Sequence, residues 1–331
     1  MTAFEVILDA WGELQKERPA QSGLYERRIF SKSGRSLFAG LKNPDRALQL
    51  LLYIPISDLG NWLDLETRGF DLKADRKIVV NGRVRIRLEL VNPSFRDLFG
   101  RLCADAIEAI LEASSDANAI AAMRARVDHW RRFIERAGSS GLSEDAQVGL
   151  YGELVFLNAL LSAGYSAEHA VGAWHGPLGE NHDFCFGSTA IEVKSTVANI
   201  DSLIVISNEN QLDDTGLKLL GLCRVSLYRR QNLSGTLPDL VRSTISAVGP
   251  NYAPLLEDRL LSAGYHEDDA ARYSVYGYAM RGVRYYSVSS GFPRIVPPDL
   301  AIGVSRVSYN VDLAVAGGFE TSLEYLLKMA N

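Results

Sequence analysis

The chain has 331 residues, of which 47% are hydrophobic and 23% are charged, a mixture typical of a folded globular protein. This composition excludes an intrinsically disordered chain, because such chains carry too few apolar side chains to offset the entropy lost on folding. The formal net charge is −5, so nucleic acid can be held only by a local basic surface. The length favours about two domains.

The cysteines and the apolar segments predict a cytoplasmic location. The three cysteines, Cys103, Cys185 and Cys223, are odd in number and show no C-x-x-C spacing, as expected of reduced thiols. The longest apolar run, near Leu50–Ile56, is far shorter than the roughly 20 residues of a membrane-spanning helix. Acidic residues interrupt the apolar N-terminus, which argues against a secretory signal, and we expect no membrane partner.

Residues 1–92 are predicted to form a β-rich N-terminal module. An amphipathic helix over residues 3–18 precedes the strands. The segment Arg83–Leu90 alternates strictly between charged and apolar residues, which is typical of a strand with one buried face. Shorter strands are expected over residues 25–30, 37–41, 48–56 and 69–72.

Two helices follow and are predicted to form a helical connector over residues 93–138. The first begins at Asn92-Pro93-Ser94 and runs to about Ala113, because proline is favoured in the first turn of a helix. The second spans about residues 116–137 and is rich in arginine. The segment Gly138–Gly141 ends it and is the best candidate linker.

Helical and strand patterns mix in residues 139–331, which we expect to form the second domain with a C-terminal extension. Ser143 is a good N-cap for a helix that runs through Ser162 and ends at Gly164. Further helices are expected over residues 209–220, 236–248, 252–263 and 319–329. Further strands are expected over residues 170–174, 203–207, 223–229, 273–288 and 302–311, and on both sides of Gly187-Ser188.

Two acidic residues and a lysine fall on one face of the hairpin predicted around Gly187-Ser188. A two-residue turn that begins with glycine pairs Phe186 with Thr189, and therefore Asp183 with Glu192, at a Cβ separation of roughly 5 Å. Opposed carboxylates destabilise a sheet unless one is protonated or a cation lies between them. Mg²⁺ is a suitable cation, because it prefers carboxylate oxygens. Lys194 lies on the same face, about 7 Å along the strand.

The helix over residues 144–162 carries an acidic residue on its apolar face. Glu153 falls inside the arc formed by its leucines, where a carboxylate is costly unless it is paired or bound to metal. Gly149 and Gly152 leave room for close approach of the backbone. We therefore expect this helix to pack on the sheet and to point Glu153 at Asp183 and Glu192.

The order of these residues resembles the PD-(D/E)xK nuclease superfamily. Glu153 is followed after 29 residues by Asp183, and after 8 more by Glu192-Val193-Lys194. Over residues 143–215 the chain is similar to the bacterial "PD-(D/E)XK motif protein" family of endonucleases. The strings that carry this similarity are Gly149–Leu157, Trp174–Pro177, His182–Phe184 and Ile191–Thr196. One departure is His182, which stands where the superfamily motif has proline.

The resemblance implies an α/β protein with a restriction-endonuclease-like core, in which helices flank a mixed central sheet. It implies Mg²⁺-dependent hydrolysis of DNA, with Mn²⁺ as a substitute, in a restriction or phage-defence setting. Asp183 and Glu192 would bind the metal, Glu153 would bind it directly or through water, and Lys194 would be the catalytic lysine. A homodimer and association with other defence subunits are left open.

Other interpretations of these residues remain open. Asp183, Glu192 and Lys194 can form a structural ion cluster, since most Glu-x-Lys pairs are surface ion pairs. The whole protein can be a catalytically inactive DNA-binding or assembly subunit of a defence complex, or a nuclease that acts on RNA.

Three further polar groups are candidates for auxiliary roles. His182 can contact a phosphate or a metal-bound water, or can be structural. Gln211, at the start of a predicted helix, can reach substrate or can simply begin that helix. His175, His182 and Cys185 are zinc-type ligands, but their irregular spacing does not favour a zinc site.

Basic regions offer candidate surfaces for DNA. Five arginines between residues 271 and 310, interleaved with tyrosines, suit phosphate contact and base stacking, although an ordinary exposed strand explains them equally well. They are Arg272, Arg281, Arg284, Arg294 and Arg306. The arginine-rich helix over residues 116–137 is better explained as a solvated face, and the arginines of Arg83–Leu90 are a weaker candidate.

Overall fold

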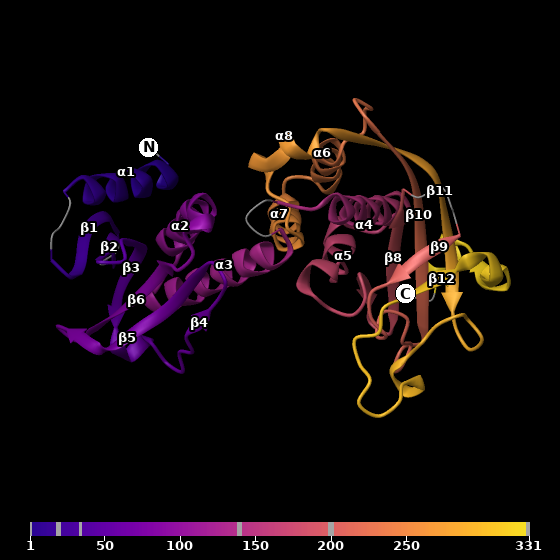
Figure 1. Ribbon diagram of the computed structural model, residues 1–331, viewed down its shortest axis with the longest axis horizontal. Helices are drawn as coiled ribbons and strands as arrows, with labels where there is room; N and C mark the ends of the chain where they lie inside the picture. The colour runs from indigo at the N-terminus through magenta and orange to yellow at the C-terminus, as the bar shows by residue number, and fades with distance from the viewer. Residues whose placement is uncertain (1, 18–20, 33–34, 138–140, 198–201, 329–331) are drawn as a thin grey trace. The chain divides into compact units, whose positions relative to one another are not determined.

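The chain divides into two compact units, Met1–Ser139 and Ser140–Asn331. The computed structural model (Figure 1) describes residues 2–17, 21–32, 35–137, 141–197 and 202–328. Most of the predicted linker Gly138–Gly141 lies outside the described residues.

The first unit contains a six-stranded antiparallel sheet in the order β1-β2-β3-β6-β5-β4. In β6 (Arg83–Leu90) every second residue is buried, as the alternating sequence predicts. The other strands are β1 (Gly23–Lys32), β2 (Arg35–Asn43), β3 (Ala47–Pro55), β4 (Leu65–Glu66) and β5 (Phe70–Val80).

Three helices complete the first unit: α1 (Ala3–Lys16), α2 (Arg96–Glu112) and α3 (Asp116–Ala137). Thr2 begins α1 with a capping box that includes Glu5. Trp11 of α1 stacks on Phe99 of α2, with ring centroids 5.5 Å apart, and both side chains are buried. Helix α2, which follows the sheet in the chain, therefore shares a core with α1, which precedes it.

A mixed five-stranded sheet organises the second unit, in the order β13-β11-β10-β8-β7. β8 and β10 run parallel, and the other neighbouring strands are antiparallel. The strands are β7 (Phe184–Phe186), β8 (Thr189–Thr196), β10 (Leu219–Gln231), β11 (Tyr276–Val288) and β13 (Glu320–Thr321). A separate two-stranded sheet pairs β9 (Leu203–Ile206) with β12 (Tyr309–Asp312).

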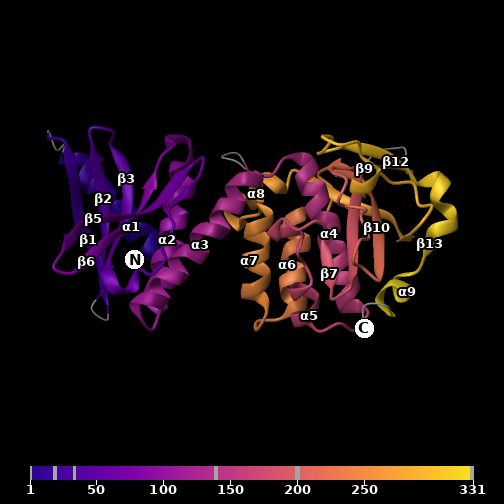
Figure 2. The same cartoon turned by 90° about the horizontal axis from the view of Figure 1, so that it is seen from below.

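Alternation along β8 separates two hydrophobic cores. Ile191 and Val193 join the core formed with α4 (Glu144–Ser162), α6 (Leu237–Val248) and α7 (Ala253–Ala263). Ala190 joins the core of the opposite face, with residues of β9 and β12. Figure 2 shows these helices and the β9–β12 pair on opposite sides of the central strands. The remaining helices are α5 (Ala167–Gly172), α8 (Ala270–Tyr273) and α9 (Leu323–Lys328).

Four predicted elements differ from the structure. The helix expected over 319–329 is limited to α9, because Glu320 and Thr321 pair with β11 as strand β13. The strand expected over 170–174 is mostly α5, because the Ser166 side chain caps the backbone N–H of His169 and begins a helix. The helix expected over 209–220 consists of turns up to Leu219, where β10 begins. The strand expected over 302–311 is limited to β12. Among the described residues, no helix has both the length and the apolarity to cross a bilayer.

Candidate active site

The hairpin β7–β8 has the predicted register. Phe184 pairs with Ile191, Cys185 with Ala190 and Phe186 with Thr189. One residue before β7, the Asp183 side chain reaches across to β8, where its Oδ2 accepts a hydrogen bond of 2.7 Å from the backbone N–H of Val193. The turn therefore brings Asp183 beside Glu192, one residue from Val193.

Glu192 is buried, with 1% of its surface exposed. Burial raises the pKa of this carboxyl well above its ordinary value, and the negative charge of Asp183 raises it further. Lys194 opposes this shift, because its Nζ lies 2.8 Å from Glu192 Oε1. The other oxygen, Oε2, is buried and has no hydrogen-bond partner among the described residues.

Helix α4 brings a third carboxylate, Glu153, to the same place. A Cβ on Gly152 would lie 1.7 Å from Ser195 Oγ, so only glycine allows α4 to approach β8 this closely. Glu153 follows Gly152 directly, and the indole Nε1 of Trp174 donates a hydrogen bond of 2.7 Å to its Oε2. A Cβ on Gly149 would meet nothing within 4 Å, so the expected role of Gly149 in close packing was wrong.

A glycine separates Glu153 from Asp183. A Cβ on Gly176 would lie 2.7 Å from Asp183 Oδ1 and 2.9 Å from Glu153 Oε2. The two carboxylates therefore face the same small space, which a side chain at this position would fill. The charge of Glu153 also contributes to the raised pKa of Glu192.

Gln211 holds the lysine in place. Its Oε1 accepts hydrogen bonds from Lys194 Nζ at 2.9 Å and from the backbone N–H of Ser207 at 2.8 Å. The residue lies in a turn after β9 and not at the start of a helix as expected. Through these two hydrogen bonds, Gln211 links the turn after β9 to the amine of Lys194.

His182 is turned toward Asp213. Burial lowers the pKa of its imidazole, while a hydrogen bond to the backbone of Asp213 opposes this shift. Its Nε2 is buried and has no hydrogen-bond partner among the described residues. His182 is therefore suited to remain neutral at pH 7.

The side chains at this site fit a hard divalent cation. Glu153, Asp183 and Glu192 offer carboxylate oxygens, which Mg²⁺ and Mn²⁺ prefer. Within the described ranges Glu192 Oε2 has no hydrogen bond, and Gly176 keeps open the space between the other two carboxylates. Three acidic side chains and one lysine leave a local excess of negative charge, which a cation would offset.

A row of cations continues across the sheet from Lys194. Arg224 of β10 pairs in register with Lys194 of β8 on one side and with Arg284 of β11 on the other, so the three side chains share a face. Arg281 falls at the β-bulge of β11, a feature that redirects a side chain. Arg224, Arg281 and Arg284 line one pocket of about 270 Å³.

The other predicted DNA-binding arginines lie elsewhere. Arg294 is bound within the protein, to Asp214 at 3.0 Å and to the carbonyl of Leu212 at 2.7 Å. Arg306 lies in the loop before β12, and Arg272 lies on α8. The five arginines therefore do not form one surface.

The remaining basic regions pair with acids of the first unit. On α3, Arg124 and Arg131 form ion pairs with Asp128, and Arg131 also pairs with Glu135. Arg126 pairs with Asp105; the side chain of Arg136 is not among those described. On β6, the arginines contact acidic side chains of β1, β5 and α3.

The mixed sheet flanked by helices, with three acids and a lysine gathered where α4 meets β8, is consistent with the PD-(D/E)XK class of proteins. A family model described as "Putative PD-(D/E)XK family member, (DUF4420)" matches residues 7–314, so the chain belongs to this family. No curated protein and no solved structure matches the chain.

Sequence reasoning missed three residues of this region. Trp174 and Gly176 stand in the Trp-His-Gly-Pro string that carried the resemblance, but the string does not reveal that the loop folds back onto Asp183. Arg224 gave a clearer signal, because a single charge inside an apolar strand is unusual.

Proposed function

We propose that the protein is a metal-dependent endonuclease that hydrolyses DNA phosphodiester bonds in a restriction or phage-defence system. One observation carries the proposal: three carboxylates from α4, β8 and the loop before β7 converge beside Lys194, and one oxygen of the buried Glu192 has no hydrogen-bond partner in the part of the chain that the structure describes. A structural ion cluster would be expected to satisfy that oxygen, because an unmade hydrogen bond to a buried charge costs stability.

The proposal gives each residue a role. Asp183 and Glu192 would hold Mg²⁺, and Glu153 would complete the metal shell directly or through water. When bound, the ion supplies Lewis-acid polarisation of the scissile phosphate. Lys194 would orient the attacking water and stabilise the charge that develops on the phosphate oxygens.

Two neighbours would act as positioning residues. The Gln211 side chain accepts a hydrogen bond from Lys194 Nζ and so fixes the amine. The indole of Trp174 donates to Glu153 and fixes that carboxylate. Such supporting hydrogen bonds orient metal ligands and catalytic groups.

DNA is the substrate that the charge distribution supports. The net charge of −5 gives no general attraction for a polyanion, so phosphate contacts must come from a local surface. The face shared by Lys194, Arg224 and Arg284 continues directly from the carboxylates. Arg224 itself is buried, whereas Arg281 and Arg284 are exposed. A phosphodiester backbone at this site would present one phosphate to the metal and others to Arg281 and Arg284.

The test is cleavage by the full chain with Mg²⁺ or Mn²⁺. Supercoiled, linear and single-stranded DNA and RNA would be compared, with Asp183→Ala and Lys194→Ala as inactive variants and Arg242→Ala as the control. Arg242 is exposed on α6 and pairs with Asp239. We expect DNA cleavage that both active-site variants abolish and the control retains.

Two results would contradict the proposal in different ways. Cleavage of RNA alone would overturn the assignment of DNA as substrate. DNA binding without cleavage, combined with the absence of Mn²⁺ binding, would identify a catalytically inactive subunit of a defence complex.

A further inference from the structure

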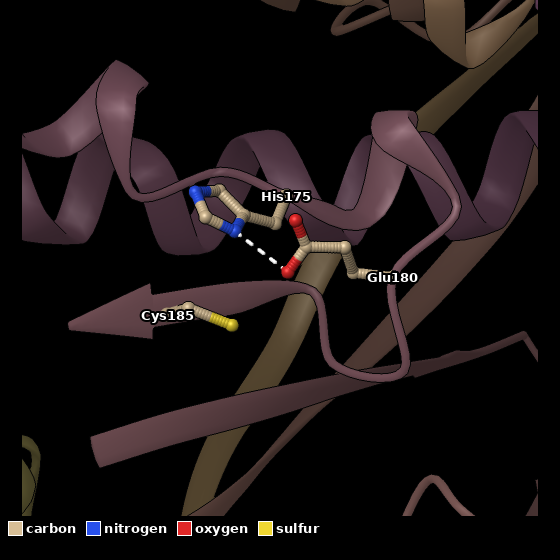
Figure 3. A group of neighbouring side chains, drawn as sticks. All are labelled: His175, Glu180 and Cys185. Carbon is tan, nitrogen blue, oxygen red and sulfur yellow. Dashed lines mark hydrogen bonds and ion pairs between the residues drawn. The ribbon is translucent and has the colours of Figure 1, made fainter. Parts of the chain in front are cut away.

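A second group of metal-ligating side chains lies beside β7 (Figure 3). His175, Glu180 and Cys185 each offer one ligand atom, and these atoms all lie within 4.8 Å of one another. We propose that this group is a binding site for a Zn²⁺-type transition-metal ion, separate from the carboxylate site. The inference does not depend on the proposed nuclease function.

The backbone holds two of the three residues in place. The N–H of Cys185 donates to the carbonyl of Ala173 at 2.9 Å, and the N–H of His175 donates to the carbonyl of Asp183 at 2.8 Å. Between these bonds, Trp174 and Phe184 form an isolated β-bridge, and both side chains are fully buried. This pairing sets His175 opposite Asp183 and Ala173 opposite Cys185, so His175 and Cys185 are diagonal neighbours on one face of the bridge.

A tight turn returns the third residue. The segment Gly176–Leu178 forms one turn of 3₁₀ helix that ends at Gly179, whose φ of 82° lies in the left-handed region favoured by glycine. The chain then reverses and brings Glu180 back to His175, where Nδ1 and Oε2 are 2.9 Å apart. Figure 3 shows the Cys185 side chain on its strand below the contact between His175 and Glu180.

The ligand chemistry selects the metal. One nitrogen, one carboxylate oxygen and one sulfur suit Zn²⁺ and Co²⁺, whereas Mg²⁺ prefers oxygen ligands alone. Tetrahedral zinc, with bonds of about 2.0 to 2.3 Å, separates its ligand atoms by roughly 3.3 to 3.8 Å. To reach this geometry, the ligand atoms that are up to 4.8 Å apart must move closer, and the hydrogen bond of 2.9 Å between His175 and Glu180 must open. Three protein ligands leave a fourth position for water, and the side chains of His175 and Glu180 are 28% and 52% exposed.

This site differs from the one that the sequence suggested. The zinc-type ligands considered from the sequence were His175, His182 and Cys185, and their spacing did not favour a zinc site. His182 turns toward the backbone of Asp213 instead, and Glu180 takes its place. The spacing of these residues in the sequence does not predict a metal site, because a loop brings the ligands together and they do not lie along one helix or strand.

The position of the cluster suggests what the ion does. Asp183 lies between Glu180 and Cys185 in the chain, and its carbonyl accepts hydrogen bonds from the N–H groups of His175 and Gly176. An ion that joins His175 to Glu180 and Cys185 would tie both ends of this segment together. The ion is therefore expected to stiffen the loop that carries Asp183.

The test uses the full chain after chelator treatment, with Co²⁺ and Zn²⁺ as probes. All variants also carry Glu192→Gln, which removes a ligand of the carboxylate site. We expect one equivalent of Zn²⁺ by elemental analysis after gel filtration, and a near-ultraviolet thiolate-to-Co²⁺ absorption band. Cys185→Ser should abolish the band, and His175→Ala should weaken binding about tenfold or more.

The controls separate ligation from folding. His169→Ala removes a nearby exposed histidine and should leave binding unchanged. Glu180→Gln keeps the size of a half-exposed side chain and should also weaken Co²⁺ binding. A Co²⁺ spectrum without a thiolate band, or equal zinc content in the parent, His175→Ala and Cys185→Ser proteins, would overturn the proposal.

Discussion

Glu192 is the residue in which stability and function conflict most directly. Its carboxyl is buried and its pKa is raised well above the ordinary 4.5, first by loss of solvation and then by the charge of Asp183. The contact with Lys194 does not cancel these effects. A protein under selection for stability alone would carry a neutral side chain at this position.

Replacement of Glu192 by glutamine should therefore stabilise the metal-free protein. Because the folded-state pKa is raised, this carboxyl contributes most to stability below pH 4.5, and the contribution is lost as the pH rises through the folded-state value. Glu192→Gln should raise the unfolding temperature near pH 7 by about 2–4 °C for each kcal/mol gained. Thermal unfolding with EDTA from about pH 5 to about pH 8 measures this effect. A lower unfolding temperature for the variant across that range would contradict it.

Gly176→Ala should damage the carboxylate site with little effect on the fold. The added methyl group would lie 2.7 Å from Asp183 Oδ1 and 2.9 Å from Glu153 Oε2, so both side chains must move. We expect Mn²⁺ affinity, measured by titration calorimetry, to fall about tenfold or more. Gly172→Ala is the matched control, because a Cβ there meets nothing within 4 Å. Equal Mn²⁺ affinities in the two variants would show that the space beside Gly176 is not needed.

These residues show where sequence reasoning reaches its limit. Glu192 and Lys194 could be placed on one face from alternation alone, and the two-residue turn set Asp183 beside them. The contact between Trp174 and Glu153 could not be foreseen, because it depends on a loop whose path no periodicity encodes. The same holds for Glu180, which reaches His175 only through the reversal at Gly179.

At the scale of elements, the site depends on how closely α4 approaches β8. Gly152 faces Ser195 without a Cβ between them, and the next residue is Glu153. The leucine pattern of α4 predicted which face of the helix is buried, and Gly152 indicated that α4 and β8 lie close together. The segment 208–218 was harder, because the side chains of Asn208 and Asp213 bond the backbone N–H groups of Asn210 and Thr215 and so compete with a helix.

Gly152→Ala should push α4 away from β8. Its Cβ would lie 1.7 Å from Ser195 Oγ and 3.0 Å from Ser195 Cβ, and overpacking of this kind costs about 1–3 kcal/mol. Chemical denaturation should show the loss, and Ser195→Ala in the same chain should restore part of it by removing the closer atom. Gly149→Ala, three residues earlier on α4, should be neutral or stabilising, since a Cβ there is unobstructed. Equal stabilities for the two alanine variants would show that the α4–β8 spacing can relax freely.

At the scale of the whole molecule, the distribution of charge decides where a polyanion can bind. The chain carries 35 basic and 40 acidic residues, so most arginines are expected to pair with neighbouring acids. Arg124 and Arg131 of α3 and Arg85 and Arg87 of β6 do pair with acids. The row from Lys194 through Arg224 to Arg284 also has acidic partners, Glu192 for Lys194 and Glu320 for Arg284, but it lies beside the carboxylate site. Arg224 and Arg284 also line a pocket with Arg281.

A double variant, Arg281→Ala with Arg284→Ala, should therefore weaken DNA binding. Each phosphate contact that is lost lowers the slope of log affinity against log salt by about 0.9, so two lost contacts should lower it by about 2. Fluorescence anisotropy with a labelled duplex and Ca²⁺ in place of Mg²⁺ would measure both quantities. We expect affinity to fall about tenfold or more near 0.1 M salt.

The matched control is Arg124→Ala with Arg131→Ala on α3, which removes the same charge from a helix whose arginines already pair with Asp128 and Glu135. This control should bind DNA as the parent does, because its arginines belong to the first unit, whereas the carboxylates and the proposed row of cations belong to the second. A large loss of DNA affinity in the control variant, with no loss in the Arg281/Arg284 variant, would show that DNA binds to the first unit. It would then leave the arginine row of β10 and β11 without a role in substrate binding.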